Sequence, residues 1–154
     1  MKKLILFLLF SSAVLANSQF NAINVARGQQ CISNLKQIGM MLVMYQDRLD
    51  KEADSISEKL KKMNVSNSLG CCPNAKGKKE YLFLGITTST KIPVAMDRLG
   101  NHQNSVNVLY RDGRTETIRH NAKNYQELLG SFKNLSKQEK ETLAAILKKF
   151  DEEK

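Results

Sequence analysis

Apolar residues recur at helical spacing between positions 19 and 49, at intervals of three and four residues. The repeating residues are Cys31, Leu35, Ile38, Leu42, Tyr45 and Leu49. This spacing places them on one face of a helix. Two glycines, Gly28 and Gly39, each cost about 1 kcal/mol relative to Ala in a helix interior. We therefore predict a long helix over about residues 20–49, closely approached by another part of the chain at both glycines.

A shorter helix is expected to follow. Ser55-Ile56-Ser57-Glu58 has the form of a capping box, which starts helices, and Ile56, Leu60 and Met63 would then share one face. Residues 64–79 are rich in Asn, Ser, Gly, Pro and Lys, a composition that is typical of a loop.

From residue 80 the pattern becomes extended. Strands are predicted at about 81–86 and 92–96, where Pro93 favours an edge position. In a third strand, Val106, Val108 and Tyr110 lie on one face, and residues 114–118 form a fourth. Asp112-Gly113 between the last two predicts a tight hairpin turn with positive φ at both residues.

The pattern returns to helix near the C-terminus. Residues 124–132 are expected to form a short helix that ends near Gly130, and Ser136 to Glu139 is a second capping box. One apolar face follows, made of Leu143, Ile146, Leu147 and Phe150. The predicted fold class is α+β, with a long N-terminal helix on a small antiparallel sheet and added C-terminal helices.

The first 16 residues resemble a secretory leader. Lys2 and Lys3 precede an apolar run over residues 4–10, and Val14 and Ala16 occupy the −3 and −1 positions of a cleavage site before Asn17. The apolar run is shorter than the roughly 20 residues that a membrane helix needs, so we expect no transmembrane segment after leader removal. The predicted divisions are a signal peptide (1–16), a globular domain (17–123) and a helical extension (124–154), in a protein secreted to the periplasm or the cell exterior.

The net charge is +9, but the basic residues are spread along the chain. Trp is absent, and aromatic residues do not alternate with basic ones as they do in a platform that stacks nucleic-acid bases. The composition therefore predicts no specific nucleic-acid binding.

The three cysteines are Cys31, Cys71 and Cys72, and no C-x-x-C pair occurs. The usual spacing of a structural zinc site is thus absent, and we predict no metal and no cofactor. A Cys3His site completed by His102 is the alternative. In an oxidising compartment a disulfide from Cys31 to Cys71 or Cys72 is expected. Closing this loop would stabilise the fold by about 4 kcal/mol in the chain-entropy model.

Two segments resemble a bacterial family. Residues 31–39 read CISNLKQIG, similar to the C-x-N-N-L-K-Q-I-G segment of prepilin-like proteins, and His102 is separated by nine residues from Asp112-Gly113. Cys72-Pro73 also matches a Cys-Pro of that family. Over about residues 24–119 the chain thus resembles the H-X9-DG, or DUF1559-type, family related to type II secretion pseudopilins. It lacks the F-T-L-I-E leader and long apolar helix of that family, so the resemblance implies the globular pilin-like domain.

His102 and Asp112 can be interpreted as a site or as two structural residues. A strand between them would separate them by roughly 15–20 Å, which favours the structural interpretation. Asp112 and Gly113 would then form the turn, and His102 would hydrogen-bond a loop backbone or pack over the long helix. No G-x-S-x-G, H-E-x-x-H or phosphate-binding glycine loop occurs, and we predict no catalytic residues.

These patterns predict a secreted, non-enzymatic, pilin-like domain that acts through a protein partner in the cell envelope or outside the cell. Two alternatives remain. One is a membrane-anchored minor pseudopilin of a type II secretion or type IV pilus-like system. The other is a small metal-binding protein or enzyme that uses His102 and the cysteines.

Overall fold

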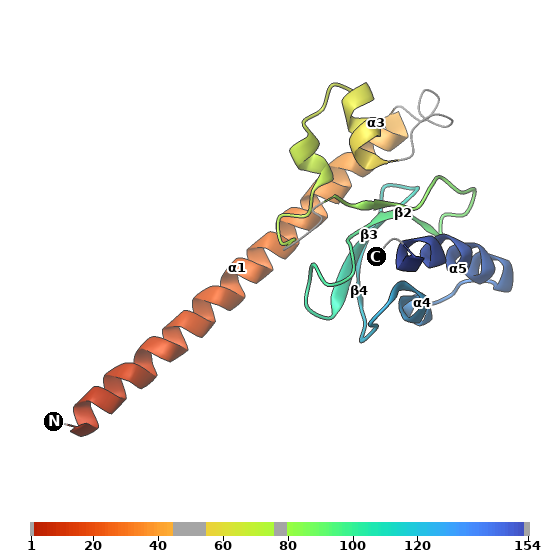
Figure 1. Cartoon of the computed structure of the whole chain (residues 1–154). Helices are drawn as coiled ribbons and strands as arrows, with labels where there is room; N and C mark the ends of the chain where they lie inside the picture. The colour runs from red at the N-terminus through yellow and green to blue at the C-terminus, as the bar shows by residue number, and fades with distance from the viewer. Residues whose placement is uncertain (1, 45–54, 76–79, 153–154) are drawn as a thin grey trace.

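The computed structural model describes the backbone of residues 2–44, 55–75 and 80–152, and side chains from residue 22 onward. Figure 1 shows a long helix joined to a domain of strands and shorter helices. The described elements include helices and a four-stranded antiparallel sheet. The predicted α+β class is confirmed at this level.

The first helix, α1 (Lys2–Met44), has 43 residues. The prediction that it begins near residue 20 is wrong. No Gly or Pro occurs between residues 2 and 27, so nothing in this stretch breaks a helix. The N-terminal half of α1 extends away from the domain (Figure 1). The predicted continuation to Tyr45 and Leu49 lies outside the described residues.

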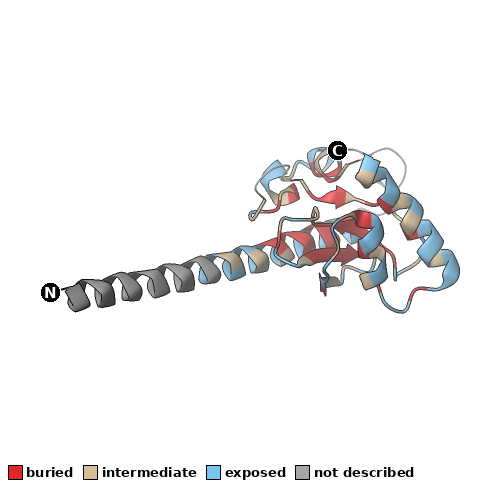
Figure 2. Ribbon diagram, turned by 60° about the horizontal axis from the view of Figure 1, so that its bottom comes forward, coloured by how far each residue is buried: buried red, intermediate tan, exposed pale blue. Residues whose placement is uncertain are grey.

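Among the residues of α1 whose side chains are described, the buried ones lie in its C-terminal half. Cys31, Leu35, Ile38 and Leu42 are buried, as their spacing predicted. Residues 22–30 are exposed or partly exposed, and Figure 2 shows the buried residues of α1 only where the helix meets the sheet. Cys31 is therefore the first described residue of α1 that the domain covers.

The two glycines of α1 differ. A Cβ atom at Gly39 would lie 2.7 Å from Leu109 Cδ1 and 3.3 Å from Gly113 Cα, so the predicted close approach is confirmed there. At Gly28 no atom would lie within 4 Å of a Cβ. The same prediction is wrong for Gly28.

The sheet has the order β1-β2-β3-β4, with every neighbouring pair antiparallel. Its strands are β1 (Leu82–Phe83), β2 (Pro93–Met96), β3 (Ser105–Tyr110) and β4 (Thr115–Arg119). Sequential strands are thus spatial neighbours, and β2 and β3 are the inner strands.

Two strand predictions need correction. The first strand is shorter than predicted because Gly85 has a φ of +90°, which leaves the extended region. Pro93 lies on an inner strand and not at the edge of the sheet. It is tolerated because it is the first residue of β2, where the register with β3 shifts.

Each face of the sheet is covered by a different layer. Val106, Val108 and Tyr110 share one face, as predicted, and pack in one core with Leu143 and Leu147. The opposite face contributes its own residues to a core with α1 and α3, namely Val94, Ala95 and Leu109. Figure 1 shows α1 and α5 on opposite sides of the sheet.

The shorter helices begin where their capping residues predict. Ser55 caps α3 (Ile56–Lys62) by accepting a hydrogen bond from the backbone nitrogen of Glu58 at 3.1 Å. Before α5 (Lys137–Glu152), Ser136 and Glu139 exchange two hydrogen bonds of 2.8 and 3.2 Å. Both predicted capping boxes therefore start helices. The remaining helical segments are η1 (Asn67–Gly70), α4 (Tyr125–Leu128) and η2 (Leu129–Ser131).

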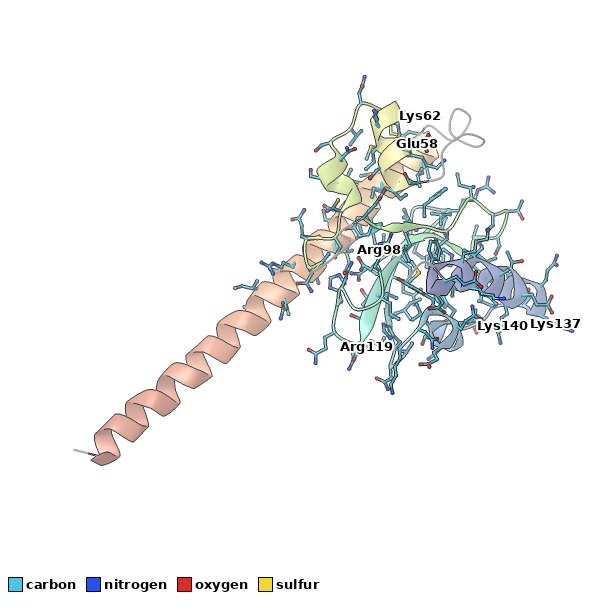
Figure 3. All side chains as sticks on the ribbon, viewed as in Figure 1. Glu58, Lys62, Arg98, Arg119, Lys137 and Lys140 are labelled. Carbon is cyan, nitrogen blue, oxygen red and sulfur yellow. The ribbon has the colours of Figure 1, made fainter. Side chains whose placement is uncertain are left out.

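Basic side chains project from several elements. In Figure 3, Lys62 lies on α3 beside Glu58, Arg98 follows β2, Arg119 ends β4, and Lys137 and Lys140 lie on α5. These labelled residues are thus spread over the domain. Among the residues whose side chains the structure describes, no helix is long and apolar enough to cross a membrane.

Candidate functional site

Four titratable side chains from separate parts of the chain meet where the C-terminal half of α1, which contributes one of them, packs on the domain. They are Cys31, Cys72, Asp97 and His102, and we call them the buried cluster. One ligand atom from each residue lies within 4.8 Å of those of the other three. At most 8% of each residue is exposed to solvent. This cluster is the candidate functional site.

The fold delivers each member from a different element. Cys31 lies at the start of the buried stripe of α1. Cys72 follows η1 in the loop that pairs with the chain near β1, through the bridge between Cys71 and Glu80. This bridge holds Cys71, the residue directly before Cys72, against Glu80. It therefore helps to fix the position of Cys72.

Asp97 and His102 flank the turn between β2 and β3. The backbone nitrogen of Asp97 donates to the carbonyl oxygen of Asn107 at 2.9 Å, which continues the β2–β3 pairing by one residue. Because side chains alternate along a strand, Asp97 lies on the same face as Ala95, toward α1. His102 forms a bridge with Ser105 immediately before β3.

Contacts within the cluster converge on a common centre. Cys31 Sγ lies 2.8 Å from Asp97 Oδ1 and 3.6 Å from Cys72 Sγ. His102 Nε2 lies 3.3 Å from Cys72 Sγ and 3.2 Å from Asp97 Oδ2. The four residues therefore form a closed ring of contacts.

Polar groups around the cluster fix the carboxylate of Asp97. The backbone nitrogen and the side-chain Nδ2 of Asn107 both donate to Asp97 Oδ2, at 2.9 and 2.8 Å. The hydroxyl of Thr117, on β4, donates to Asn107 Oδ1 at 2.7 Å. Because its amide oxygen is held by Thr117, Asn107 presents its NH2 group to Asp97.

Two further side chains orient the sulfur and the imidazole. The Tyr81 hydroxyl lies 3.1 Å from Cys31 Sγ. On the other side of the imidazole, Asn74 Nδ2 lies 3.5 Å from His102 Nδ1 and donates to the carbonyl oxygen of Asn101 at 2.7 Å. Cys31, Asp97 and His102 thus each contact a polar side chain outside the cluster, namely Tyr81, Asn107 and Asn74.

The ionisation of Cys72 and His102 is shifted in opposite directions. The hydrogen bond with Cys31 is the main reason why the pKa of the Cys72 thiol falls to about 6; burial opposes it, and His102 acts with it. Burial disfavours the imidazolium form, but hydrogen bonds to Asp97 and Cys72 raise the pKa of His102 to about 10. Both shifts favour the charged forms, a thiolate on Cys72 and an imidazolium on His102.

Cys31 and Tyr81 stay neutral. The hydrogen bond with Cys72, together with burial and the negative charge of Asp97, raises the pKa of Cys31 well above that of a free thiol. Burial is the main cause of a raised pKa at Tyr81. The two cysteines of the cluster are in contact, yet their pKa values are shifted in opposite directions.

His102 and Asp112 are not brought together. His102 is buried before β3, and Asp112 lies after β3 in an exposed turn, where it accepts a hydrogen bond from the backbone nitrogen of Arg114 at 3.0 Å. The described side-chain partners of His102 are the side chains of the cluster, Asn74 and Asn107, and not a loop backbone. The alternative, packing against the long helix, agrees with its ring nitrogen lying within 4.8 Å of Cys31 Sγ on α1. Its nearest carboxylate is Asp97.

The hairpin turn forms at Asp112-Gly113 but differs from the predicted type. Gly113 has a φ of +81°, and Asp112 is not among the described residues with positive φ. The backbone nitrogen of Gly113 donates to the carbonyl oxygen of Tyr110 at 3.0 Å. Only the glycine needs the left-handed conformation, as in a hairpin with a glycine bulge.

The structure separates the two candidate partners of Cys31. Cys72 is its neighbour, with unbonded sulfur atoms 3.6 Å apart. Cys71 is only partly buried, and its sulfur lies 3.5 Å from the carbonyl oxygen of Asn67. The disulfide stays a prediction, and Cys72 is the partner within reach.

Asp97 is the member of the cluster that sequence reasoning missed. It looks like one of several scattered acidic residues. The signal that finds it is its position directly after the apolar strand 92–96, in phase with the inward-facing Ala95. A carboxylate at an inward-facing position must be paired, because burying an unpaired charge is costly.

The arrangement differs from a catalytic Cys-His-Asp triad. In a triad, the nucleophile and the carboxylate contact opposite nitrogens of the imidazole. Here Cys72 and Asp97 both contact Nε2 of His102. The carboxylate therefore does not act through the ring on the thiol, and Nε2 faces the centre of the cluster.

Comparisons with known proteins give no relative. No protein-family model, curated protein or solved structure matches the chain. The likeness to prepilin-like proteins thus rests on the sequence motifs alone.

Proposed function

We propose that this protein is a non-enzymatic, pilin-like protein of the cell envelope or the cell exterior, and that it works by protein–protein contact through α1. The observation that carries the proposal is the distribution of exposed apolar side chains. All large hydrophobic residues exposed among those described lie on α1; they are Ile23, Val25, Met40, Val43 and Met44. Single exposed apolar residues are ordinary, but their restriction to one helix favours an interface.

The part of α1 that extends from the domain has apolar residues on more than one side. Ile23 is 50% exposed and Val25 is 65% exposed. These residues are two positions apart, so they point to different sides of the helix. A helix with apolar residues on several sides is suited to burial among other helices, as in the core of a filament or bundle.

A photo-crosslinking amino acid at position 25 tests this role in cells that make the full chain. We expect cross-links from position 25 to protein, either a second copy or a partner, and none from position 140, which is exposed on α5. An Ile23→Asp substitution should reduce the cross-links. Equal cross-linking from both positions would overturn the proposal.

The membrane-anchored pseudopilin is the second candidate, and the course of α1 favours it. The helix begins at Lys2 and runs without a break through the predicted cleavage site before Asn17. An anchored form would use this continuity to connect its apolar end rigidly to the domain. Intact mass after fractionation distinguishes the candidates: a chain that starts at Asn17 in the soluble fraction supports secretion, and a full-length chain in the membrane fraction supports the anchor.

A further inference from the structure

We propose that the buried cluster binds one Zn²⁺ ion and that this ion holds α1 on the globular domain. The proposal goes beyond the function proposed above and does not depend on it. It rests on the geometry of the four side chains, on the chemistry of their ligand atoms and on their positions in the fold.

The distances fit a tetrahedral ion. With metal–ligand lengths of about 2.0–2.3 Å, neighbouring ligand atoms of a tetrahedral zinc site are separated by about 3.3–3.8 Å. The Cys31–Cys72, Cys72–His102 and His102–Asp97 separations are 3.6, 3.3 and 3.2 Å. The carboxylate contacts use two oxygens: His102 Nε2 meets Oδ2 and Cys31 Sγ meets Oδ1, and one of them would bind the ion. The Cys31–Asp97 separation is shorter, at 2.8 Å. The ion would widen this contact, and the rest of the ring is already near the required size.

The ligand types select zinc among the common ions. Two thiolates, one imidazole nitrogen and one carboxylate oxygen are the donors that tetrahedral zinc accepts. Calcium and magnesium require shells of oxygen atoms. The convergence of both Cys72 and Asp97 on Nε2 of His102, which does not suit a catalytic triad, is the arrangement that neighbouring ligands of one ion adopt.

The surrounding residues have the roles expected around a metal. Asn107 donates twice to Asp97 Oδ2 and so fixes the carboxylate. Tyr81 lies against Cys31 Sγ. Groups of this kind orient ligands and commonly strengthen metal binding. They also offset the formal charge of −1 that two thiolates and a carboxylate leave around the ion.

Ion binding changes the protonation of the cluster. Both thiols bind as thiolates and the imidazole binds in its neutral form, so the cluster releases protons when the ion binds. With Nε2 bound to the ion, the proton of the neutral ring lies on Nδ1, on the side of Asn74.

The position of the cluster indicates a structural role. Four protein ligands leave no open coordination position, as is typical of structural zinc and not of catalytic zinc. The ligands join α1, the loop after η1, the end of β2 and the approach to β3. Since Cys31 is the first described residue of α1 covered by the domain, the ion would lie where the extended part of the helix begins.

The test uses full-length protein that has been reduced, freed of metal with a chelator and then titrated with zinc chloride alone. We expect one zinc per chain in the wild type. Cys72→Ser and His102→Gln should weaken binding at least tenfold. Two matched controls, Cys71→Ser and His120→Gln, change the same residue types outside the cluster and should leave binding unchanged.

Cobalt chloride gives an independent readout on the wild type alone, so the test does not depend on whether a variant folds. We expect the absorption bands of a tetrahedral cobalt ion with thiolate ligands, and their disappearance when zinc is added. A chelator should lower the thermal midpoint of the wild type and of Cys71→Ser. A wild type that binds less than one-tenth of an equivalent of zinc would overturn the proposal. Two other outcomes would overturn it too. One is a loss of zinc binding by Cys71→Ser that equals the loss by Cys72→Ser. The other is protein recovered from cells with a Cys31–Cys72 disulfide and no zinc.

Discussion

The two faces of the sheet are built from different kinds of residues. The buried residues that the structure describes on the face toward α5 are apolar or aromatic, among them Val106, Val108 and Leu143. The face toward α1 and α3 holds all the buried polar or charged residues that the structure describes, which are Asn34, Lys59, Asp97, His102 and Asn107. Buried polar groups cost free energy unless they are paired. Both faces therefore carry an apolar core, and the α1 face adds the paired polar groups of the candidate chemistry.

The largest expected effect comes from removing the buried carboxylate on the α1 face. In metal-free protein, Asp97→Ala leaves the donors of Asn107 and the charge of His102 without their carboxylate. Removing one partner of a buried ionic network costs about 3–5 kcal/mol, and we expect this loss in the free energy of unfolding by urea. The control is Asp112→Ala, an exposed turn carboxylate, which should cost at most about 1 kcal/mol. Similar losses for both would contradict this account of the cluster.

A substitution in the apolar core on the α5 face should lower the free energy of unfolding by an amount that does not depend on metal. Leu143 on α5 is fully buried, so Leu143→Ala removes apolar contacts and leaves a cavity, at a cost of about 2–5 kcal/mol. The loss should be the same with and without a chelator. Ile146→Ala, on a partly buried residue of the same helix, is the control and should cost less. If a chelator changed the effect of Leu143→Ala, the two faces would not be independent.

A third prediction concerns the contact between α1 and the sheet. Gly39→Ala places a Cβ 2.7 Å from Leu109 Cδ1, and such overpacking costs about 1–3 kcal/mol. The matched control is Gly28→Ala on the same helix. It has open space around it and should stabilise the helix by up to about 1 kcal/mol. Thermal unfolding of both variants measures the difference, and shifts of the same sign would show that Gly39 does not mark a close approach.

The smallest expected effect is a pH dependence on the α5 side. The hydrogen bond from Ser89, with the backbone bond of the capping box, lowers the pKa of Glu139 from 4.5 to about 2. Because the pKa is lower in the folded state, the stabilisation is present above pH 4.5 and is lost as the pH falls toward 2. Glu139→Gln should remove this part of the acid dependence of the thermal midpoint, and Glu141→Gln, on an exposed residue of the same helix, should not. Parallel acid profiles for Glu139→Gln and the wild type would contradict the assignment.

Much of the fold can be predicted because its signals are local. The stripe of α1, the capping residues Ser55 and Ser136, and the alternation of Val106, Val108 and Tyr110 each act within a few residues, and each led to the observed element. One error came from an effect that reaches further. The edge position predicted from Pro93 was wrong because the pairing of β2 with both neighbours is a property of the whole sheet.

The sequence by itself determined the α+β class, most elements and the presence of three cysteines and two histidines as the available ligand chemistry. Only the tertiary structure decided which of them meet. Cys71 and Cys72 are adjacent in sequence, yet Cys71 faces the carbonyl oxygen of Asn67 in η1 and Cys72 lies against Cys31. The reason is physical: the packing of α1 on the sheet joins positions 31, 72, 97 and 102 in space. No local spacing encodes contacts between segments so far apart in the chain.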